Sequence, residues 1–392
     1  MSKKLTICLL NDSFPPTIDG VSNTVLNYAD IIQRKYGNAI VATPQYPGAR
    51  DAYDFPVIRY PSIDTTRILS GYRAGIPFSP KAIRAIVERK PDLIHLHCPY
   101  ASAMLAKRLQ SELKVPMVFT YHTKFDIDIA NMFELEALRA TAKRLTVSGI
   151  KRCDDVWAVS DIAGKNLESL GYKGEWRVMH NGVDFPRERA SDDDVAELRR
   201  KYELADGLPV FLFVGRMMFY KGLDTIVDAL GLAHARGLDF RMFFVGGGED
   251  SDDVIARAKS AGIADKCVFT GAIVNRALLR VYFSMADAFL FPSLYDSAGL
   301  VVHEAAACSL MSVVIRDSAP AEGVEDGENG LLIDASTESL SLAVERVARD
   351  LPAARTMGER ASRTLYKSWE DAVDDAWTRY EEVIARTAAT SK

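Results

Sequence analysis

The stretch that decides the fold is KLTICLLNDSFPPTIDGVSNTVLNYADIIQRKYG, residues 4–37, which joins a short apolar run to a longer amphipathic one. Residues 4–12 are rich in aliphatic and β-branched side chains, as in a buried strand, and a loop with two prolines follows. After this loop, apolar side chains recur at the spacing of a helix that ends at Gly37, namely Val21, Val25, Leu26, Ala29 and Ile32. A strand that leads through a loop into a helix is the repeating unit of a parallel α/β sheet.

The same unit recurs along the whole chain, with one interruption. Turn residues and a run of charges at 179–194 break the pattern, as in a linker between domains. We therefore predict two α/β domains with doubly wound, Rossmann-like parallel sheets, one over residues 1–185 and one over 186–365. Besides 4–12, the segments predicted as strands are 38–44, 91–99, 115–122 and 153–160 in the first domain, and 208–216, 240–248, 266–273, 287–293, 312–317 and 330–334 in the second.

Residues 366–392 form the last predicted segment, a long amphipathic helix. Five of its apolar side chains fall on one side, so the helix is expected to pack against another element, which we predict to be the first domain. These side chains are Trp369, Val373, Trp377, Tyr380 and Ile384.

Composition and charge narrow the classes of protein. The chain has 392 residues, and no apolar run approaches the ~20 residues that cross a bilayer. Its five cysteines are scattered without CxxC spacing, which favours a reducing compartment, so we expect a cytoplasmic protein. Residues 1–185 carry 24 Lys and Arg against 19 Asp and Glu, and the remainder carries 24 against 34. The small basic excess and the lack of a recognition motif disfavour nucleic-acid binding.

The segment SLYDSAGLVVHEAAA, residues 293–307, places two acids eight positions apart around a glycine. If a helix begins near Gly299, Asp296 lies in the loop before it and Glu304 lies inside it, on a different face, so the pair is not an acid/base couple. The N–H groups near Gly299, Leu300 and Val301 could then receive a phosphate, and the carboxylates could accept bonds from sugar hydroxyls. The alternative is that Asp296 caps the helix and Glu304 pairs with a core cation.

Two further loops of the second domain follow predicted strands. In VGRMMFYKG, residues 214–222, Arg216 and Lys221 stand at the end of a strand, where two cations suit a diphosphate, although a solvated surface pair is the alternative. GGGEDS, residues 246–251, resembles a phosphate loop but has Ser251 where GxGxxG requires glycine, so its glycines could merely permit the turn.

The first domain offers Gly20 between a strand and a helix, and three histidines near strand ends. His95 and His97 form an HxH pattern that could ligate a metal, but no third and fourth ligand appears at a recognisable spacing. His122 has the features of a hydrogen-bonding cleft residue, and a buried histidine is the alternative. A DxD motif at 126–128 recurs in form at 192–194 and 250–252, so it carries little information.

A basic segment, residues 138–152, interleaves Leu138, Leu145 and Ile150 with lysines and arginines. A basic amphipathic helix can lie on an anionic membrane, and a solvated helix face is the alternative.

Taken together, these motifs resemble the family-4 glycosyltransferases of the GT-B fold. The matching pieces occur in the family's order over nearly the whole chain: GVSNTV (20–25), DLIHLH (92–97), YHT (121–123), HNGVD (180–184), VGRMMFYKG (214–222), GGGE (246–249), ADAFLFPSLYDSAGLVVHEAAA (286–307) and EGVEDGENGLL (322–332). The resemblance implies two Rossmann-like domains facing a central cleft, with a nucleotide-diphosphate sugar held mainly by the second.

The resemblance also implies roles for individual residues. Arg216 and Lys221 would bind the diphosphate, Glu304 the ribose hydroxyls and Asp296 the donor sugar. Gly20 would let backbone approach the phosphates, and His122 would contact the donor sugar near the reacting carbon. Such enzymes transfer with retention of configuration and need no bound metal or other cofactor, because cations and a helix N-terminus can stabilise the leaving diphosphate.

The chain departs from the family pattern at three places. Asp296 stands where glutamate is more usual, Ser309 and Met311 replace the glycine and proline of a GxP motif, and Asp19 precedes Gly20 where a double glycine is common.

We therefore expect a retaining, metal-independent hexosyltransferase that uses UDP-glucose or a related UDP-hexose. TYHTKFDIDI, residues 120–129, and the basic segment after it are similar to enzymes that glycosylate diacylglycerol, so a lipid acceptor is expected, with the protein peripheral at the inner face of the membrane. The alternatives are a nucleotide-sugar 2-epimerase of the same fold and a non-catalytic, two-lobed sugar-binding protein.

Overall fold

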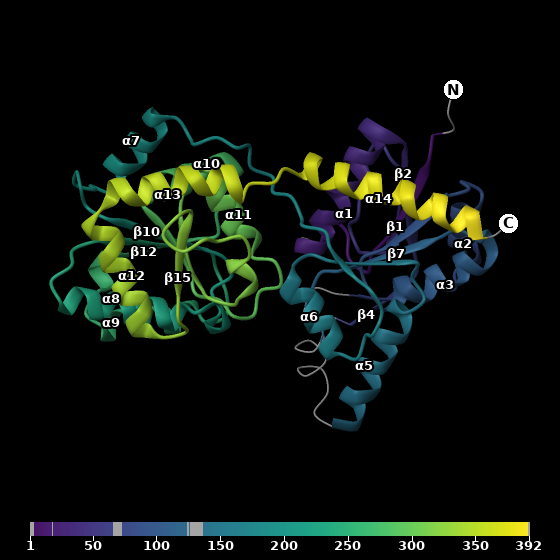
Figure 1. The fold of residues 1–392 in the computed structure, drawn as a ribbon, viewed down its shortest axis with the longest axis horizontal. Coiled ribbons are helices and arrows are strands. Elements are labelled where there is room, and N and C mark those ends of the chain that lie inside the picture. The colour runs from purple at the N-terminus through teal and green to yellow at the C-terminus, as the bar shows by residue number, and fades with distance from the viewer. Residues whose placement is uncertain (1–3, 18, 66–72, 124, 126–135, 391–392) are drawn as a thin grey trace. The chain divides into compact units, whose positions relative to one another are not determined.

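A computed structural model describes residues 4–17, 19–65, 73–123, 125 and 136–390 of the chain. The chain divides into two compact units (Figure 1). The first unit combines Met1–Asn181 with Trp369–Lys392, and the second is Gly182–Ser368.

The first unit is built on a seven-stranded parallel sheet in the order β3-β2-β1-β6-β7-β8-β9. The strands are β1 (Thr6–Leu10), β2 (Asn38–Pro44), β3 (Val57–Tyr60), β6 (Leu93–Leu96), β7 (Met117–Tyr121), β8 (Asp155–Ala158) and β9 (Arg177–Val178). An antiparallel pair, β4 (Ser62–Asp64) and β5 (Arg73–Gly75), lies outside this sheet. The helices are α1 (Gly20–Ile31) with its π-helical continuation η1 (Ile32–Tyr36), α2 (Pro80–Val87), α3 (Ala101–Leu113), α5 (Glu136–Ile150), α6 (Asp161–Ser169) and α14 (Trp369–Thr390).

The final helix, α14, belongs to the first unit, as the sequence predicts. Its apolar side packs into the core beside α1, with Val373 and Tyr380 fully buried (Figure 1). Arg379 forms a two-armed ion pair with the buried carboxylate of Asp155 at 2.6 and 2.7 Å, and Trp157 donates to the same carboxylate at 2.7 Å. Although burial opposes ionisation, these bonds hold the pKa of Asp155 below its usual value. A charged, bidentate contact therefore adds to the apolar packing that holds the helix in place.

The second unit has a six-stranded parallel sheet in the order β12-β11-β10-β13-β14-β15. Numbered along the chain, this is the 3-2-1-4-5-6 order of the Rossmann fold. The strands are β10 (Val210–Val214), β11 (Arg241–Val245), β12 (Cys267–Gly271), β13 (Ala288–Phe291), β14 (Ser312–Ile315) and β15 (Gly330–Ile333). The helices are α7 (Asp192–Lys201), α8 (Leu223–Ala235), α9 (Ser251–Ser260), α10 (Arg276–Met285), α11 (Leu300–Ala307), α12 (Thr337–Arg349) and α13 (Leu351–Thr364), with 3₁₀ turns η2 (Phe219–Lys221), η3 (Ala264–Lys266) and η4 (Ala319–Ala321).

The predicted class, two parallel α/β sheets with the last helix on the first domain, is confirmed. Every segment predicted as a strand contains one, because nearly all are runs of apolar residues buried on both faces of a sheet; the exception is the edge strand β12, whose residues are half-buried or exposed. Strands β3, β4, β5 and β9 were not predicted; they are short, and their residues are mostly half-buried or exposed, so their patterns are weak. No helix in the described ranges is both long enough and apolar enough to span a bilayer.

Candidate functional site

The order of strands marks one edge of each sheet as the place for a site. In both sheets the strand order reverses at a switch point, between β1 and β6 in the first unit and between β10 and β13 in the second. Loops leaving the carboxyl ends of two such strands diverge to opposite faces and leave room for a ligand. In the second unit, Arg216 follows β10 by two residues and Asp296 follows β13 by five, so this switch point collects the predicted residues.

Lys221 and Asp296 meet across this switch point. Lys221 Nζ lies 2.5 Å from Asp296 Oδ1, and the two side chains are only 14% and 19% exposed. Ser293 Oγ donates to the other carboxylate oxygen, Oδ2, at 2.5 Å. Arg216, on the same loop as Lys221, is exposed, and its Nη2 donates to Tyr220 Oη at 3.2 Å. The loop acid therefore does not cap the following helix; it forms an ion pair with the lysine of the neighbouring loop.

The glycines after β11 serve close packing. A side chain at Gly246 would meet the carbonyl oxygen of Gly215 at 1.8 Å, and one at Gly248 would meet that of Met217 at 2.4 Å. Met217 N also donates to the carbonyl oxygen of Gly247 at 3.0 Å. This loop could be a phosphate loop, or its glycines could merely permit a turn. The structure favours the turn, since the glycines let the loop lie against the backbone that precedes Lys221.

Helix α11 begins at Leu300, as predicted, with Gly299 as its N-terminal capping residue. Gly299 has φ +58°, and a side chain there would contact Cα of Pro320 at 2.7 Å, so glycine is required both by conformation and by space. The N–H groups of the first helical residues, Leu300 and Val301, lack carbonyl partners within the helix. They are therefore suited to an anion at the same sheet edge as Lys221.

Glu304 lies in the second turn of α11 and is paired with Arg276, the first residue of α10. Nη2 of Arg276 is 2.6 Å from Glu304 Oε1 and 3.9 Å from Asp184 Oδ2, and the guanidinium carbon lies 4.1 Å from the centre of the Phe185 ring. The Glu304 side chain is 17% exposed. Burial raises its pKa and Arg276 partly opposes the rise. Arg276 is therefore the cation that pairs with Glu304. It lies at the surface, and no sequence motif had identified it.

In the first unit, Gly20 opens α1 immediately after Asp19. Asp19 Oδ1 accepts from the N–H groups of Val21 and Ser22 at 2.9 and 2.7 Å, and Ser22 Oγ accepts from Asp19 N at 3.1 Å. This capping box occupies two of the donors at the helix start and places a carboxylate there. Among the described residues, apart from the chain neighbours of Gly20 and the backbone of its own helix, no atom lies within 4 Å of the position of a Gly20 side chain, so the described packing does not require glycine.

His122 follows β7, and it is buried rather than open. Its Nε2 lies 2.9 Å from Nδ1 of His97, and burial lowers the pKa of His122 to about 3, so the imidazole is neutral at physiological pH. Both ring nitrogens of His95 are bonded, Nδ1 to Tyr380 Oη at 2.6 Å and Nε2 to Thr120 Oγ1 at 2.7 Å. His95 is thus explained by packing and hydrogen bonds, whereas Nε2 of His97 is buried without a hydrogen-bond partner among the described residues. Within the described ranges, no group of three or more His, Cys, Asp or Glu side chains is placed to hold a metal ion.

The remaining predicted motifs have separate positions in the chain. Asp192–Asp194 forms the first turn of α7, and Asp250 accepts from the N–H group of Phe219 at 2.7 Å. The DxD motif at 126–128 lies outside the described residues. The basic segment falls largely on α5, where Leu138 and Leu145 are 47% and 69% exposed.

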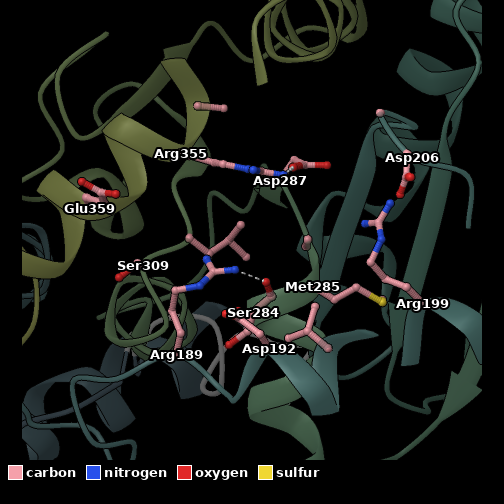
Figure 2. A pocket seen from close by; sticks show the side chains of 15 residues that line it. Arg189, Asp192, Arg199, Asp206, Ser284, Met285, Asp287, Ser309, Arg355 and Glu359 are labelled. Atoms are coloured by element: carbon pink, nitrogen blue, oxygen red, sulfur yellow. Dashed lines mark hydrogen bonds and ion pairs between the residues drawn. The ribbon is translucent and has the colours of Figure 1, made fainter. Parts of the chain in front are cut away.

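A cavity of about 420 Å³ lies at the opposite edge of the second sheet (Figure 2). Asp287, which lines it, directly precedes β13 and accepts from the N–H group of Val210 at the start of β10. Two of the arginines that line the cavity already have partners in the protein. Arg189 donates to a carbonyl oxygen at 2.6 Å, and Arg355 lies 3.9 Å from Asp287. Because the cavity is at the amino ends of the strands, it is separate from the cluster around Lys221.

Comparison with known proteins gives two family matches that together span most of the chain. Residues 18–187 match "Glycosyltransferase Family 4", and residues 194–364 match "Glycosyl transferases group 1". A GDP-mannose-dependent alpha-mannosyltransferase of Corynebacterium glutamicum is 24% identical over 98% of this chain and 90% of its own length. An alpha-monoglucosyldiacylglycerol synthase of Acholeplasma laidlawii is 24% identical over 85% of this chain and 86% of its own. The structure of sucrose-phosphate synthase from Thermosynechococcus elongatus superposes with a TM-score of 0.77 at 21% identity, over 98% of this chain and 100% of that one.

Proposed function

Because the chain belongs to the family-4, group 1 glycosyltransferases, and is therefore a nucleotide-sugar-dependent hexosyltransferase, we propose a specific reaction for it. It transfers a hexose, with retention of configuration and without a metal ion, from UDP-glucose or a related UDP-hexose to an acceptor hydroxyl. The acceptor in this proposal is a membrane lipid such as diacylglycerol.

The observation that carries the proposal is the cluster at the switch point of the second sheet. Lys221 and Asp296 are in contact there, and Arg216 and the start of α11 arise from the same two loops. This arrangement offers cations and backbone donors for a diphosphate beside a carboxylate for sugar hydroxyls. On donor binding, Lys221 would turn to the phosphates and Asp296 would accept from the sugar, while Glu304 would accept from the ribose.

The same groups account for the chemistry without a metal. When the bond between the sugar and the diphosphate breaks, negative charge grows on the leaving phosphate. Arg216, Lys221 and the N–H groups of Leu300 and Val301 are positively polarised groups fixed before that charge appears, which is how preorganised sites lower a barrier. The leaving phosphate takes the proton of the acceptor hydroxyl, so no protein base is needed.

Two residues of the first unit complete the proposal. His122 would contact the donor sugar as a neutral hydrogen-bonding group, since its lowered pKa leaves it uncharged. Gly20 marks where backbone would approach the phosphates, and Asp19 would have to release the N–H groups of Val21 and Ser22 to which it bonds.

GDP-mannose is the second donor that a specific observation favours. The relative from Corynebacterium glutamicum is described as GDP-mannose-dependent, whereas the relative from Acholeplasma laidlawii is described as a glucosyldiacylglycerol synthase. The two donors differ in the base and in the configuration of one sugar hydroxyl. Asp296 is one methylene shorter than the glutamate that is more usual at this position. Its carboxylate therefore extends less far toward the sugar, and we propose that this difference affects which sugar is chosen.

The proposed acceptor rests on the surface of α5 and on the glucosyldiacylglycerol synthase relative. Leu138 and Leu145 are seven residues apart, so they project from the same face of the helix, and both are exposed. Arg144 beside them is exposed as well. Apolar side chains flanked by cations suit the boundary of an anionic lipid layer, so this helix is the proposed contact with the membrane.

A panel of nucleotide sugars tests the reaction, scored by release of nucleoside diphosphate in buffer with EDTA, with and without vesicles that contain diacylglycerol. We expect release from a UDP-hexose or GDP-mannose that increases with the vesicles, and loss by orders of magnitude in Glu304→Ala and Arg216→Ala. Near-normal activity of both variants would refute the donor site. Interconversion of the sugars without an acceptor would favour an epimerase, and binding without turnover a sugar-binding protein.

A further inference from the structure

We propose that Arg276 is a positioning residue of the donor site, which holds the carboxylate of Glu304 ionised and aimed so that it can accept hydrogen bonds from the ribose hydroxyls of the donor. This inference rests on the proposed function, because it assigns a partner to the residue that would bind the ribose. It adds a residue that lies in none of the motifs by which the site was predicted.

The position of Arg276 is fixed from three sides. Asn275 caps α10 by accepting from the N–H groups of Ala277 and Leu278, which sets the direction in which Arg276 leaves the helix. The guanidinium lies over the ring of Phe185 at 4.1 Å and reaches Glu304 Oε1 at 2.6 Å. An arginine stacked on an aromatic ring is pre-organised, so little side-chain entropy is lost in holding the carboxylate.

The contact leaves Glu304 able to bind a ligand. Arg276 engages Oε1, and a carboxylate has about four lone-pair sites on its two oxygens. A ribose hydroxyl can therefore donate to the carboxylate while Arg276 remains in place. Arg276 is 44% exposed and Glu304 is 17% exposed, so a partly exposed arginine is paired with a mostly buried acid.

The charges around Glu304 show what Arg276 opposes. Burial raises the pKa of Glu304, and Asp184 raises it further, whereas Arg276 lowers it. Cys308, which caps the C-terminus of α11, has a thiol whose pKa is raised to about 12 by burial, so it remains uncharged. Without Arg276, only the influences that favour the protonated acid remain. A protonated carboxyl accepts fewer hydrogen bonds, so binding would weaken as the pH falls.

The test is the affinity for UDP and for GDP, measured by calorimetry over a range of pH on the full chain. Wild type is expected to bind with little pH dependence near neutrality. Arg276→Ala should bind at least ~10-fold more weakly near neutral pH, with the loss growing by up to about tenfold for each pH unit as the solution is acidified. Arg276→Lys should restore most of the affinity, and Glu304→Gln in the Arg276→Ala background should remove the pH dependence.

Arg257→Ala is the matched control, because Arg257 is 43% exposed and is paired with Asp228 on the neighbouring helix α8. It should bind as wild type does. If Arg276→Ala binds equally well or more tightly, with no pH dependence, Arg276 merely competes with the ligand and the inference is overturned. If Arg276→Ala does not fold, the pH profile of Arg276→Lys against Arg276→Gln decides in its place. A wild-type affinity in Glu304→Ala would instead overturn the ribose assignment itself.

Discussion

Replacing Lys221 by alanine removes the group that we place against the leaving diphosphate. A hydrogen bond to a charged group contributes about 1.5–3 kcal/mol, which corresponds to a loss of about 10- to 150-fold in affinity for a nucleoside diphosphate. The substitution also breaks the ion pair with Asp296, whose side chain is 19% exposed. Since breaking a fully buried pair costs about 3–5 kcal/mol and this pair is partly solvated, we expect a stability loss of about 1–3 kcal/mol.

Lys266 provides the control for this substitution. The exposure of its side chain, 17%, and the 2.6 Å distance from its Nζ to Asp239 are close to the values for Lys221, whereas Asp239 is 71% exposed, so Lys266 is a control for nucleotide binding rather than for stability. Calorimetric titration with UDP and GDP, and thermal unfolding, should be measured on wild type, Lys221→Ala, Lys221→Arg and Lys266→Ala. Lys266→Ala should keep its affinity, and Lys221→Arg should keep most of it. The reasoning is refuted if the two alanine variants bind nucleotide equally well.

Four further substitutions test other parts of the account. Ser309→Gly should raise the free energy of unfolding by about 0.5–1 kcal/mol in urea titration, because Ser309 has φ +55°; a loss would contradict this. Tyr380→Phe should lower it by about 1–3 kcal/mol, since it leaves Nδ1 of His95 without its 2.6 Å partner, whereas no change would show that bond to be dispensable. Asp19→Gly should lower the KM for the donor by freeing two N–H groups, and a higher KM would argue against phosphate contact at α1. His122→Asn should lower turnover without removing a titration step, because burial lowers the pKa of His122 to about 3; loss of a step near pH 6.5 would contradict a neutral histidine.

The strands and the two parallel sheets could be predicted from the sequence, because buried parallel strands consist of continuous apolar runs. Residues 38–44, predicted as a strand, are β2 residue for residue, and Gly299 was placed at the start of its helix. Candidate site residues in the loops at the switch point could also be identified from the sequence, since parallel sheets bind ligands at these loops.

The sequence could not supply the partners of the candidate residues. Lys221 and Asp296 are 75 positions apart and meet only because β10 and β13 are neighbours. Arg276 lies in a loop-to-helix junction without a motif, and its pairing with Glu304 depends on how α10 and α11 pack. For Asp19, the sequence showed only a departure from the family pattern, and the capping box that it forms appears only in the structure.

The most direct test of the central claim is a crystal structure of the full chain with UDP or GDP bound. We expect the diphosphate to lie within hydrogen-bonding distance of Arg216, Lys221 and the N–H groups at the start of α11. The ribose hydroxyls should bond to Glu304, and Arg276 should remain in contact with that carboxylate. A nucleotide bound elsewhere, for example in the cavity beside Asp287, would contradict it.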